Sequence, residues 1–377
     1  MSLLKKSLPV FIGISIILLL LYPGQCITAA KDALNMWLYS VVPSLLPFFI
    51  LSSLLVKQCV PAGRTVRHER VAKHMFGLPP ASLYAIFTGM VSGYPAGARI
   101  TGEMVRTGVL SPEDALRTLP YTLCCSPTFL VGTVCTALLQ APELALILAL
   151  SHFGGAILCG QFYRVWYGLF QPRLEPFRET GLLESQSLNL VTATERAMKS
   201  MLFVGGNMVL FSIFIQQLQL LGLLDWCARA LHPVLSVLGL NPALGTSVAE
   251  GVIEMANGCG EVAKIAASLW QQGAAALIIL SFGSLSVAAQ SAGMLRGTPL
   301  RLRHYIFPKL VHTAIAFTLY ILLTPFLAPS AASVFGQAYL PLLQKADVSA
   351  VALVFSIFGT ICYIILLLCV YNRKKRI

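Results

Sequence analysis

Long apolar runs recur along this sequence and constrain its fold more than any other feature. They span residues 8–22, 37–56, 118–139, 143–163, 201–222, 274–295, 306–328 and 349–370. A helix needs about 20 apolar residues to cross the hydrocarbon core of a bilayer. Only 11% of the residues are charged, whereas soluble domains carry about 25%. The sequence therefore predicts an all-α polytopic protein of the lipid bilayer with about eight transmembrane helices.

Two further apolar stretches, 77–97 and 239–260, are interrupted by Gly and Pro. Such interruptions free backbone groups, which are tolerated at membrane depth only where they are buried in protein or line a cavity. We therefore expect both stretches to be re-entrant or broken hairpins. The residues expected to break the helices are Gly93, Pro95, Gly97, Gly258 and Gly260.

The distribution of basic residues predicts the orientation of these helices. With the N-terminus inside, all but four of the 27 Lys and Arg residues fall on the cytoplasmic side, Lys309 among them. The four exceptions are Lys31, Arg229, Lys264 and Lys345. Cytoplasmic loops of membrane proteins carry an excess of Lys and Arg, so both termini are expected to be cytoplasmic.

The two broken stretches belong to halves of the chain that echo one another. Gly77-Leu78-Pro79-Pro80-Ala81 matches Gly239-Leu240-Asn241-Pro242-Ala243, and Gly89 matches Gly251 at the same offset. A second small-residue break follows in each half, at 125–128 and 283–286. Because the spans 37–56 and 201–222 run in opposite directions under the predicted orientation, we expect two inverted repeats, an arrangement typical of secondary transporters. The alternative is a chance recurrence of Gly-Leu-x-Pro in apolar sequence.

This symmetry predicts the domain organisation. It comprises an N-terminal transmembrane helix (1–30), a first repeat (31–170), a cytoplasmic linker (171–195), a second, inverted repeat (196–330), and a C-terminal transmembrane helix with a basic cytoplasmic tail (331–377).

Residues 239–264 also carry a cluster of polar side chains in an apolar context. Its members are Glu250, Glu254, Asn257, Glu261 and Lys264. At about 100° per residue they fall on one narrow face of a helix, and charges at membrane depth normally face a partner or a watery cavity. The three glutamates are therefore candidates for proton or cation coupling. The alternative is a polar loop outside the bilayer.

The first half has a polar cluster of its own, Ser92-Gly93-Tyr94-Pro95-Ala96-Gly97-Ala98-Arg99. Arg99 is expected to bind a carboxylate beside the break, because its guanidinium presents five donors in a fixed fork. Lys264 holds a comparable place in the second half, so the two cations could grip opposite carboxylates of one solute. The alternative is a surface ion pair between Arg99 and Glu103, four residues apart on one helix.

Other classes of protein are disfavoured by what the sequence lacks. The ten cysteines are scattered, and Cys124-Cys125 has no His or second Cys pair at ligand spacing, so no metal and no cofactor is predicted. No metalloprotease, nucleophile-elbow or phosphate-loop motif is present, so we expect no enzyme. No interleaved basic and aromatic patch points to nucleic acid. The histidines lie mostly near predicted membrane edges, where interfacial roles are expected: His68, His74, His152, His232, His304 and His312.

Three motifs are distinctive: Pro43 to Phe49 (Pro-Ser-Leu-Leu-Pro-Phe-Phe), Ser92 to Arg99, and Cys125-Ser126-Pro127-Thr128-Phe129. With them the chain, over roughly residues 30 to 330, resembles the sporulation integral membrane protein family that carries the nucleoside-recognition Gate domain. The resemblance implies a transporter in the outer forespore membrane of spore-forming bacteria, associated with moving dipicolinic acid toward the forespore. The wider Gate-domain group includes nucleoside transporters and ferrous-iron transport proteins.

The leading interpretation is a membrane transporter of a small anionic solute, with dipicolinic acid implied by the resemblance. The predicted substrate-binding residues are Ser92, Tyr94, Pro95, Gly97, Arg99, Ser126, Pro127, Thr128, Asn257, Gly258, Lys264, Ser284 and Ser286. The coupling residues are Glu250, Glu254 and Glu261. The alternatives are a Gate-domain transporter of nucleosides or cations, and a non-transporting sporulation scaffold. The sequence fixes neither the coupling ion nor the oligomeric state.

Overall fold

The computed structural model describes residues 2–59, 70–170 and 189–327, which are largely helical and form no strand within those ranges. Five segments there are long and apolar enough to cross a membrane: Pro23–Leu51, Pro142–Tyr167, Leu190–Leu220, Leu269–Met294 and Arg303–Pro325. Two shorter apolar helices, Pro9–Leu21 and Phe129–Leu138, accompany them. The predicted all-helical membrane fold is confirmed. The expected span 349–370, the basic tail and most of the linker lie outside the described residues.

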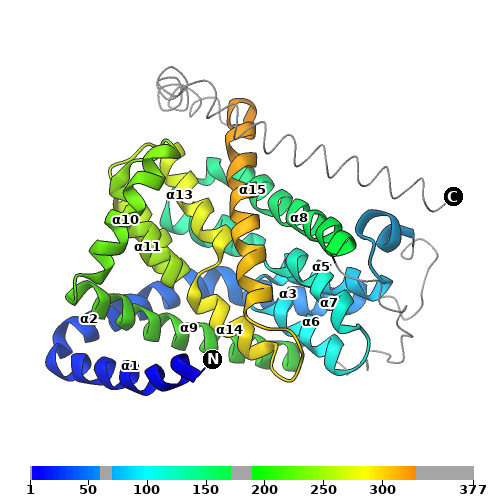
Figure 1. Ribbon diagram of the computed structural model, residues 1–377, viewed down its shortest axis with the longest axis horizontal. Helices are drawn as coiled ribbons and strands as arrows, with labels where there is room; N and C mark the ends of the chain where they lie inside the picture. The colour runs from blue at the N-terminus through cyan, green and yellow to red at the C-terminus, as the bar shows by residue number, and fades with distance from the viewer. Residues whose placement is uncertain (1, 60–69, 171–188, 328–377) are drawn as a thin grey trace.

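The N-terminal helices pack along one long helix of the second half (Figure 1). They are α1 (Ser2–Leu21), α2 (Pro23–Met36), the π-helical η1 (Trp37–Val41) and α3 (Val42–Cys59), and the long helix is α9 (Leu190–Leu220). Ser15 Oγ donates to Gln217 Oε1 at 2.7 Å, and Gln217 Nε2 donates back to the Ser15 carbonyl at 3.0 Å. Because a buried polar group is costly unless it is paired, this reciprocal contact sets the register of α1 on α9.

The first half consists of two helix–break–helix units. Its elements are η2 (Ala72–Phe76), α5 (Pro80–Ser92), α6 (Ala96–Arg106), α7 (Pro112–Thr122), η3 (Phe129–Leu138), η4 (Pro142–Leu144) and α8 (Ala145–Phe170). The first break lies at Gly93 to Pro95, with Gly93 at φ +70°. It therefore falls at two of the residues predicted to cause it. Gly97 lies inside α6, where a Cβ would strike the carbonyl of Thr122, so it serves close packing against α7.

The second half also contains two helix–break–helix units. Its elements are α10 (Leu223–Val237), η5 (Pro242–Leu244), α11 (Gly245–Ile253), α12 (Met255–Lys264), α13 (Leu269–Phe282), α14 (Leu285–Met294) and α15 (Arg303–Leu327). The break between α11 and α12 is a single extended residue, Glu254, with φ −137° and ψ 120°. The predicted break at Gly258 and Gly260 is wrong, since both lie within α12. Gly258 instead lets α12 approach α11, because a Cβ there would strike the backbone of Gly251.

Matching helices of the two halves make matching contacts. In the first half α6 packs on α14 of the second, and α12 of the second packs on η3 of the first. Likewise α7 packs on α8, and α13 packs on α15. The last helices of the two halves, α8 and α15, pack against each other, and Figure 1 shows α15 (orange) between the cyan helices and the yellow-green ones. The core of the molecule therefore lies where the halves meet.

The two glycine-proline segments matched in the sequence have the same backbone conformation. Gly77 has φ +65° and Gly239 has φ +67°, and each precedes a helical turn with Pro at its start. A Cβ on Gly89 would strike Thr122 of α7, and a Cβ on Gly251 would strike Ile279 of α13. Each glycine thus allows the first helix of its unit to pack closely against the third, since side chains at these points would separate the backbones.

The segment 118–139, expected as one membrane span, is divided. Helix α7 ends at Thr122 and η3 begins at Phe129, with an irregular connection between them. Pro127 contributes to this interruption, because it has no N–H to donate and restricts the residue before it. The predicted span is therefore a second broken unit of the first half.

Candidate functional site

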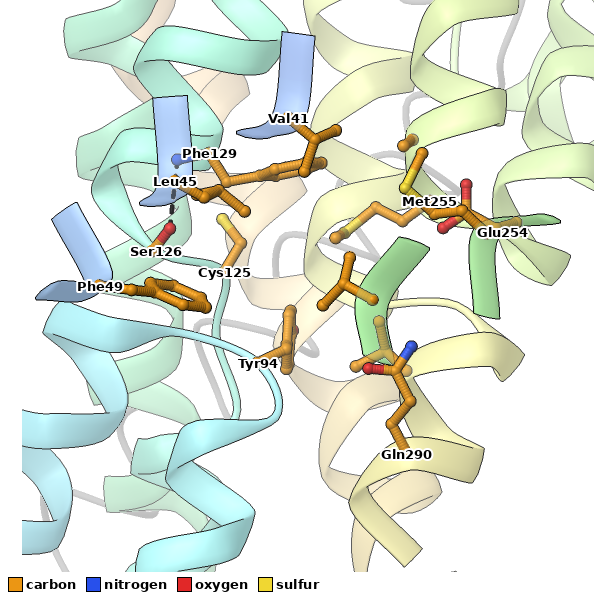
Figure 2. Close-up of a pocket in the computed structure, with 14 residues that line it drawn as sticks. Val41, Leu45, Phe49, Tyr94, Cys125, Ser126, Phe129, Glu254, Met255 and Gln290 are labelled. Atoms are coloured by element: carbon orange, nitrogen blue, oxygen red, sulfur yellow. Dashed lines mark hydrogen bonds between the residues drawn. The ribbon is translucent and has the colours of Figure 1, made fainter. Parts of the chain in front are cut away.

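A cavity lies between the two halves and is lined by both of their breaks (Figure 2). Its volume is about 50 Å³. Its polar lining comes from Tyr94 and Ser126 of the first half and from Glu254 and Gln290 of the second. The apolar lining is Val41, Leu45, Phe49, Phe129, Val204, Met208, Met255, Ala256 and Val287, and Cys125 completes the wall. An apolar cavity with a few convergent polar groups is the usual form of a small-molecule site.

Tyr94 separates this cavity from a buried polar network. Its hydroxyl lies within reach of the Leu123 carbonyl at 3.2 Å and the Leu280 carbonyl at 3.4 Å. These carbonyls belong to the ends of α7 and α13, where freed C=O groups need partners. The same hydroxyl accepts a hydrogen bond from Lys309. Tyr94 therefore connects the break between α5 and α6 to the break after α7 and to the break after α13.

Lys309 of α15 is the centre of that network. It exposes 1% of its surface, and its ammonium donates to Tyr94, to the Leu123 carbonyl at 2.7 Å and to His312 Nδ1 at 2.9 Å. All three N–H donors of the side chain therefore have acceptors. The ion pairs found among the described residues do not include Lys309, and no carboxylate bonds to it there.

Two histidines extend the network from α15 to α8. His312 Nε2 meets the His152 carbonyl at 2.8 Å, and His152 Nε2 accepts the Cys125 backbone N–H at 3.0 Å. His152 Nδ1 lies 3.1 Å from Ser281 Oγ, and Cys125 Sγ lies 3.2 Å from His152 Nε2. Since Cys125 lines the cavity, the network touches the cavity at both ends, through Tyr94 and through Cys125.

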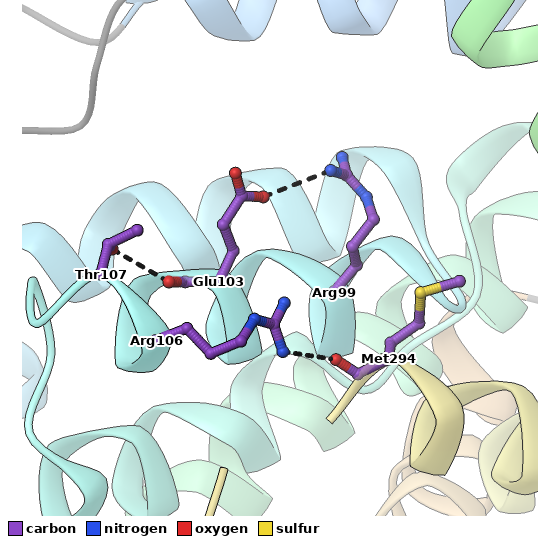
Figure 3. Close-up of polar contacts among 5 residues, drawn as sticks. All are labelled: Arg99, Glu103, Arg106, Thr107 and Met294. Carbon is purple, nitrogen blue, oxygen red and sulfur yellow. Dashed lines mark hydrogen bonds and ion pairs between the residues drawn. The ribbon is translucent and has the colours of Figure 1, made fainter. Parts of the chain in front are cut away.

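The structure does not bring the two predicted cationic clamps to the cavity. Arg99 Nη1 lies 3.4 Å from Glu103 Oε2 with about half of each side chain exposed, 52% and 46% (Figure 3). Lys264 pairs with Glu261 at 2.5 Å, with 70% of the lysine side chain exposed. The alternative interpretation of Arg99, a surface ion pair, is the arrangement observed.

The predicted polar face of residues 250–264 is also divided. Because the helix breaks at Glu254, the five residues do not share one straight face. Glu254 is 4% exposed, lines the cavity and caps α12, accepting the Asn257 N–H at 2.8 Å. Glu250 is buried on α11, whereas Glu261 is paired at the surface. Asn257 donates from its side chain to Ser212 of α9 rather than toward the cavity.

The serines of the second breaks have structural partners. Ser126 Oγ accepts the Phe129 N–H at 3.2 Å, and Ser284 Oγ accepts the Val287 N–H at 3.3 Å. Ser286 accepts from Gln290 Nε2 at 3.2 Å and so positions a residue of the cavity wall. Of the predicted binding and coupling residues, the cavity is lined by Tyr94, Ser126 and Glu254. Its lining does not include Ser92, Pro95, Gly97, Pro127, Thr128 or Gly258.

Sequence reasoning missed Lys309, His152, His312 and Gln290. Lys309 was expected in a cytoplasmic loop and the two histidines near membrane edges, yet all three are buried. Lys309 and His312 stand three residues apart in an apolar helix, and intramembrane charged residues are functional candidates by default. That spacing could have identified them. Among the described residues no group of three or more His, Cys, Asp or Glu side chains is arranged to hold a metal ion.

Comparison with known proteins finds two similarities. Residues 201–298 match the Gate family, described as nucleoside recognition. The chain is 28% identical over 319 residues to the sporulation integral membrane protein YlbJ of Bacillus subtilis (strain 168), covering 80% of this chain and 78% of that protein. No solved structure matches the chain. The Gate match runs from α9 past α14 and contains both breaks of the second half. Residues 201–298 are therefore similar to the nucleoside-recognition Gate family, and most of the chain is similar to a sporulation integral membrane protein.

Proposed function

We propose that this protein is a secondary transporter that moves a small anionic solute through the cavity between its two halves. The observation that carries the proposal is a cavity lined by broken helices of both halves, with a lysine behind its wall that forms no ion pair among the described residues. In secondary transporters the solute site lies where broken helices of two repeats meet. Arg99 and Lys264 do not lie at the cavity, so Lys309 takes their place as the cation that attracts the solute.

The buried lysine favours an anion. Removing a charge from water costs several kcal/mol unless a partner compensates it, and Lys309 has carbonyl, hydroxyl and imidazole acceptors but no carboxylate bonded to it among the described residues. A carboxylate in the cavity beside Tyr94 would supply the missing negative charge. To donate to this carboxylate, the Tyr94 hydroxyl would turn its one hydrogen away from the Leu123 or Leu280 carbonyl, to which it donates in this structure.

The matched contacts of the halves support an inverted repeat and alternating access. If the two halves are interchanged, so that α6 corresponds to α12 and η3 to α14, the α6–α14 contact becomes the α12–η3 contact. With a volume of about 50 Å³, the cavity is too small for a ring with two carboxylates. Solute entry therefore requires the halves to separate, and the packing of α8 on α15 is the natural place for one half to rock against the other.

Dipicolinic acid is the solute that best combines these features with the comparison. YlbJ is named a sporulation protein, and the family resemblance associates such proteins with dipicolinic acid in the outer forespore membrane. Dipicolinate is a flat ring with two carboxylates, which suits an apolar cavity with Phe49 and Phe129 in its wall and one buried cation behind it. We propose sporulation, and this membrane, as the setting of the transport.

The test is direct binding to the purified full-length protein, comparing dipicolinate, a nucleoside and ferrous iron. The proposal expects dipicolinate to bind and the other two to bind much more weakly. Gln290→Ala and Tyr94→Phe should each reduce dipicolinate affinity about tenfold, since a lost hydrogen bond to a charged group is worth about 1.5–3 kcal/mol. Arg99→Ala is the matched control and should bind normally. Equal affinity of wild type and the cavity variants would contradict the proposal.

A nucleoside is the second candidate solute. The Gate family is described as nucleoside recognition, and the cavity offers aromatic rings and the Gln290 amide, which could stack on and bond to a base. Cation transport rests on Glu254 and Glu250, both buried. Glu254→Gln separates these cases: it should abolish cation transport but leave dipicolinate or nucleoside binding largely intact. A non-transporting scaffold predicts no binding of any of the three probes.

A further inference from the structure

We propose that Lys309 and His312 form a proton-binding centre whose occupancy is linked to the solute, so that the protein carries its anion together with a proton. This inference rests on the proposed transport function and adds the coupling ion and the residues that hold it. The geometric basis is the 2.9 Å hydrogen bond between Lys309 Nζ and His312 Nδ1, buried behind the cavity wall.

The hydrogen bonds fix which imidazole nitrogen can accept the proton. His312 Nε2 faces the carbonyl of His152 at 2.8 Å, so Nε2 carries a hydrogen and Nδ1 is left as the acceptor for Lys309. His152 Nε2 accepts the fixed N–H of Cys125, so its Nδ1 carries the hydrogen and donates to Ser281. The shared proton therefore lies between Lys309 and His312, as ammonium with neutral imidazole or amine with imidazolium.

No acidic side chain from the surrounding helices neutralises this centre. Helices α8, α13, α14 and α15 contain no Asp or Glu. Helix α7 also packs on α15, and its two acidic residues, Glu113 and Asp114, lie in its first turn, at the opposite end from Leu123. The titratable groups that surround the pair are His152 and Cys159 from α8, Cys124 and Cys125 from the break after α7, Tyr94 from the break after α5, and Tyr305 from α15 itself. None of these groups is a carboxylate, so no side chain of the described residues bonds a negative charge to the loaded centre.

The missing charge explains how solute and proton are linked. With the cavity empty, the protonated centre is a desolvated charge without a counter-ion, which favours release of its proton. A carboxylate beside Tyr94 stabilises the protonated form, and by linkage the protonated form binds the solute more tightly. The proton enters from the water on the side where the solute binds and leaves by the same contacts when the solute departs. The only covalent bond made and broken is the N–H bond between this proton and Lys309 Nζ or His312 Nδ1.

The test measures protons taken up on dipicolinate binding by the purified full-length protein. Calorimetry in buffers of different ionisation enthalpy gives the number of protons bound per solute, and a pH-sensitive dye inside proteoliposomes gives proton entry during uptake. For the wild type we expect about one proton per dipicolinate, and affinity that falls up to about tenfold per pH unit as pH rises through the range where the centre titrates.

Two variants remove the shared proton while keeping the contacts. Lys309→Arg keeps a cation that cannot be deprotonated, so it should bind dipicolinate with affinity independent of pH and with no proton uptake. His312→Gln keeps an acceptor for Lys309 but leaves the lysine as the sole proton site, so proton uptake should occur over a different pH range than in the wild type. His74→Gln, an exposed histidine bonded to the Arg70 carbonyl, is the matched control and should behave as wild type. Detergent gel filtration confirms that each variant is folded.

The outcomes separate this inference from the proposed function. A wild type that binds none of the probe solutes overturns the proposed function and this inference together. A wild type that moves dipicolinate without protons overturns the inference alone, as does unchanged proton uptake in both Lys309→Arg and His312→Gln. The inference is also overturned if Glu254→Gln loses proton uptake while Lys309→Arg and His312→Gln retain it. That result would assign the proton coupling to Glu254.

Discussion

Ser126 and Ser284 occupy equivalent places in the two halves and make the same contact. Each is the small polar residue at the second break of its half, and each accepts a hydrogen bond from the backbone N–H three residues later, at 3.2 Å for Ser126 and 3.3 Å for Ser284. A serine in this role starts the next helix by satisfying one of its free N–H groups. The two breaks are thus built in the same way, although the surrounding residues differ.

The break at Ser284 can be tested through its backbone. Ser284 has φ +55°, a conformation that favours glycine. We expect Ser284→Ala to lower the free energy of unfolding by about 1–2 kcal/mol, since it loses the cap and keeps the strain. Ser284→Gly should cost less, because it loses the cap but relieves the strain. Thermal unfolding in detergent measures both, and an equal or larger loss for the glycine variant would show that strain is unimportant here.

Helix contact at Gly258 provides a second prediction. A Cβ at this position would strike the backbone of Gly251, whereas one at Gly206 of α9 would meet nothing within 4 Å. Gly258→Ala should destabilise the protein by about 1–3 kcal/mol through overpacking. Gly206→Ala should be neutral or stabilising by up to about 1 kcal/mol, because alanine favours a helix. The two unfolding midpoints would be compared, and similar midpoints would place α12 farther from α11 than the structure has it.

The two arginines of α6 are expected to differ. Arg106 Nη1 donates to the carbonyls of Met294 and Arg296 at 3.1 and 3.0 Å, which secures the end of α14 to the first half (Figure 3). Among the described residues the Arg99 side chain makes only an exposed ion pair with Glu103. Arg106→Ala should therefore lower stability by about 1–2 kcal/mol, whereas Arg99→Ala should change it by less than about 1 kcal/mol. A larger loss in Arg99→Ala, by chemical denaturation, would reverse this ranking.

Orientation can be tested with a native cysteine. Cys227 of α10 is exposed. Six other cysteines are buried: Cys26, Cys124, Cys125, Cys135, Cys159 and Cys259. The distribution of basic residues predicts that the end of the protein near Arg229 is outside the cytoplasm. A membrane-impermeant maleimide should therefore label Cys227 in intact cells, and Cys227→Ala should abolish that signal. A cysteine placed at Arg301 should react only after the cells are opened. Labelling at position 301 in intact cells would invert the topology.

Much of this architecture is encoded locally and could be predicted from the sequence. The apolar runs determine helices of membrane length, because a period and a length are properties of consecutive residues. Gly93 and Pro95 determine a break, since proline cannot donate to the helix and glycine accepts positive φ. Gly77 and Gly239 both adopt positive φ, as glycines before a proline-started helical turn can. Gly258 misled the prediction, because a glycine that permits a close contact looks in sequence like one that ends a helix.

The polar centre behind the cavity was decided only by tertiary structure. Tyr94, His152 and Lys309 come from the break after α5, from α8 and from α15, and no local pattern connects residues so far apart in the chain. Counting basic residues assigned Lys309 to the cytoplasmic side, because the count uses the charge of a residue and contains no information on its depth in the membrane. The sequence by itself determined where the chain is helical and where it is interrupted. The packing of α8 on α15 determined which polar groups meet, because burial leaves each of them only the partners that the other helices supply.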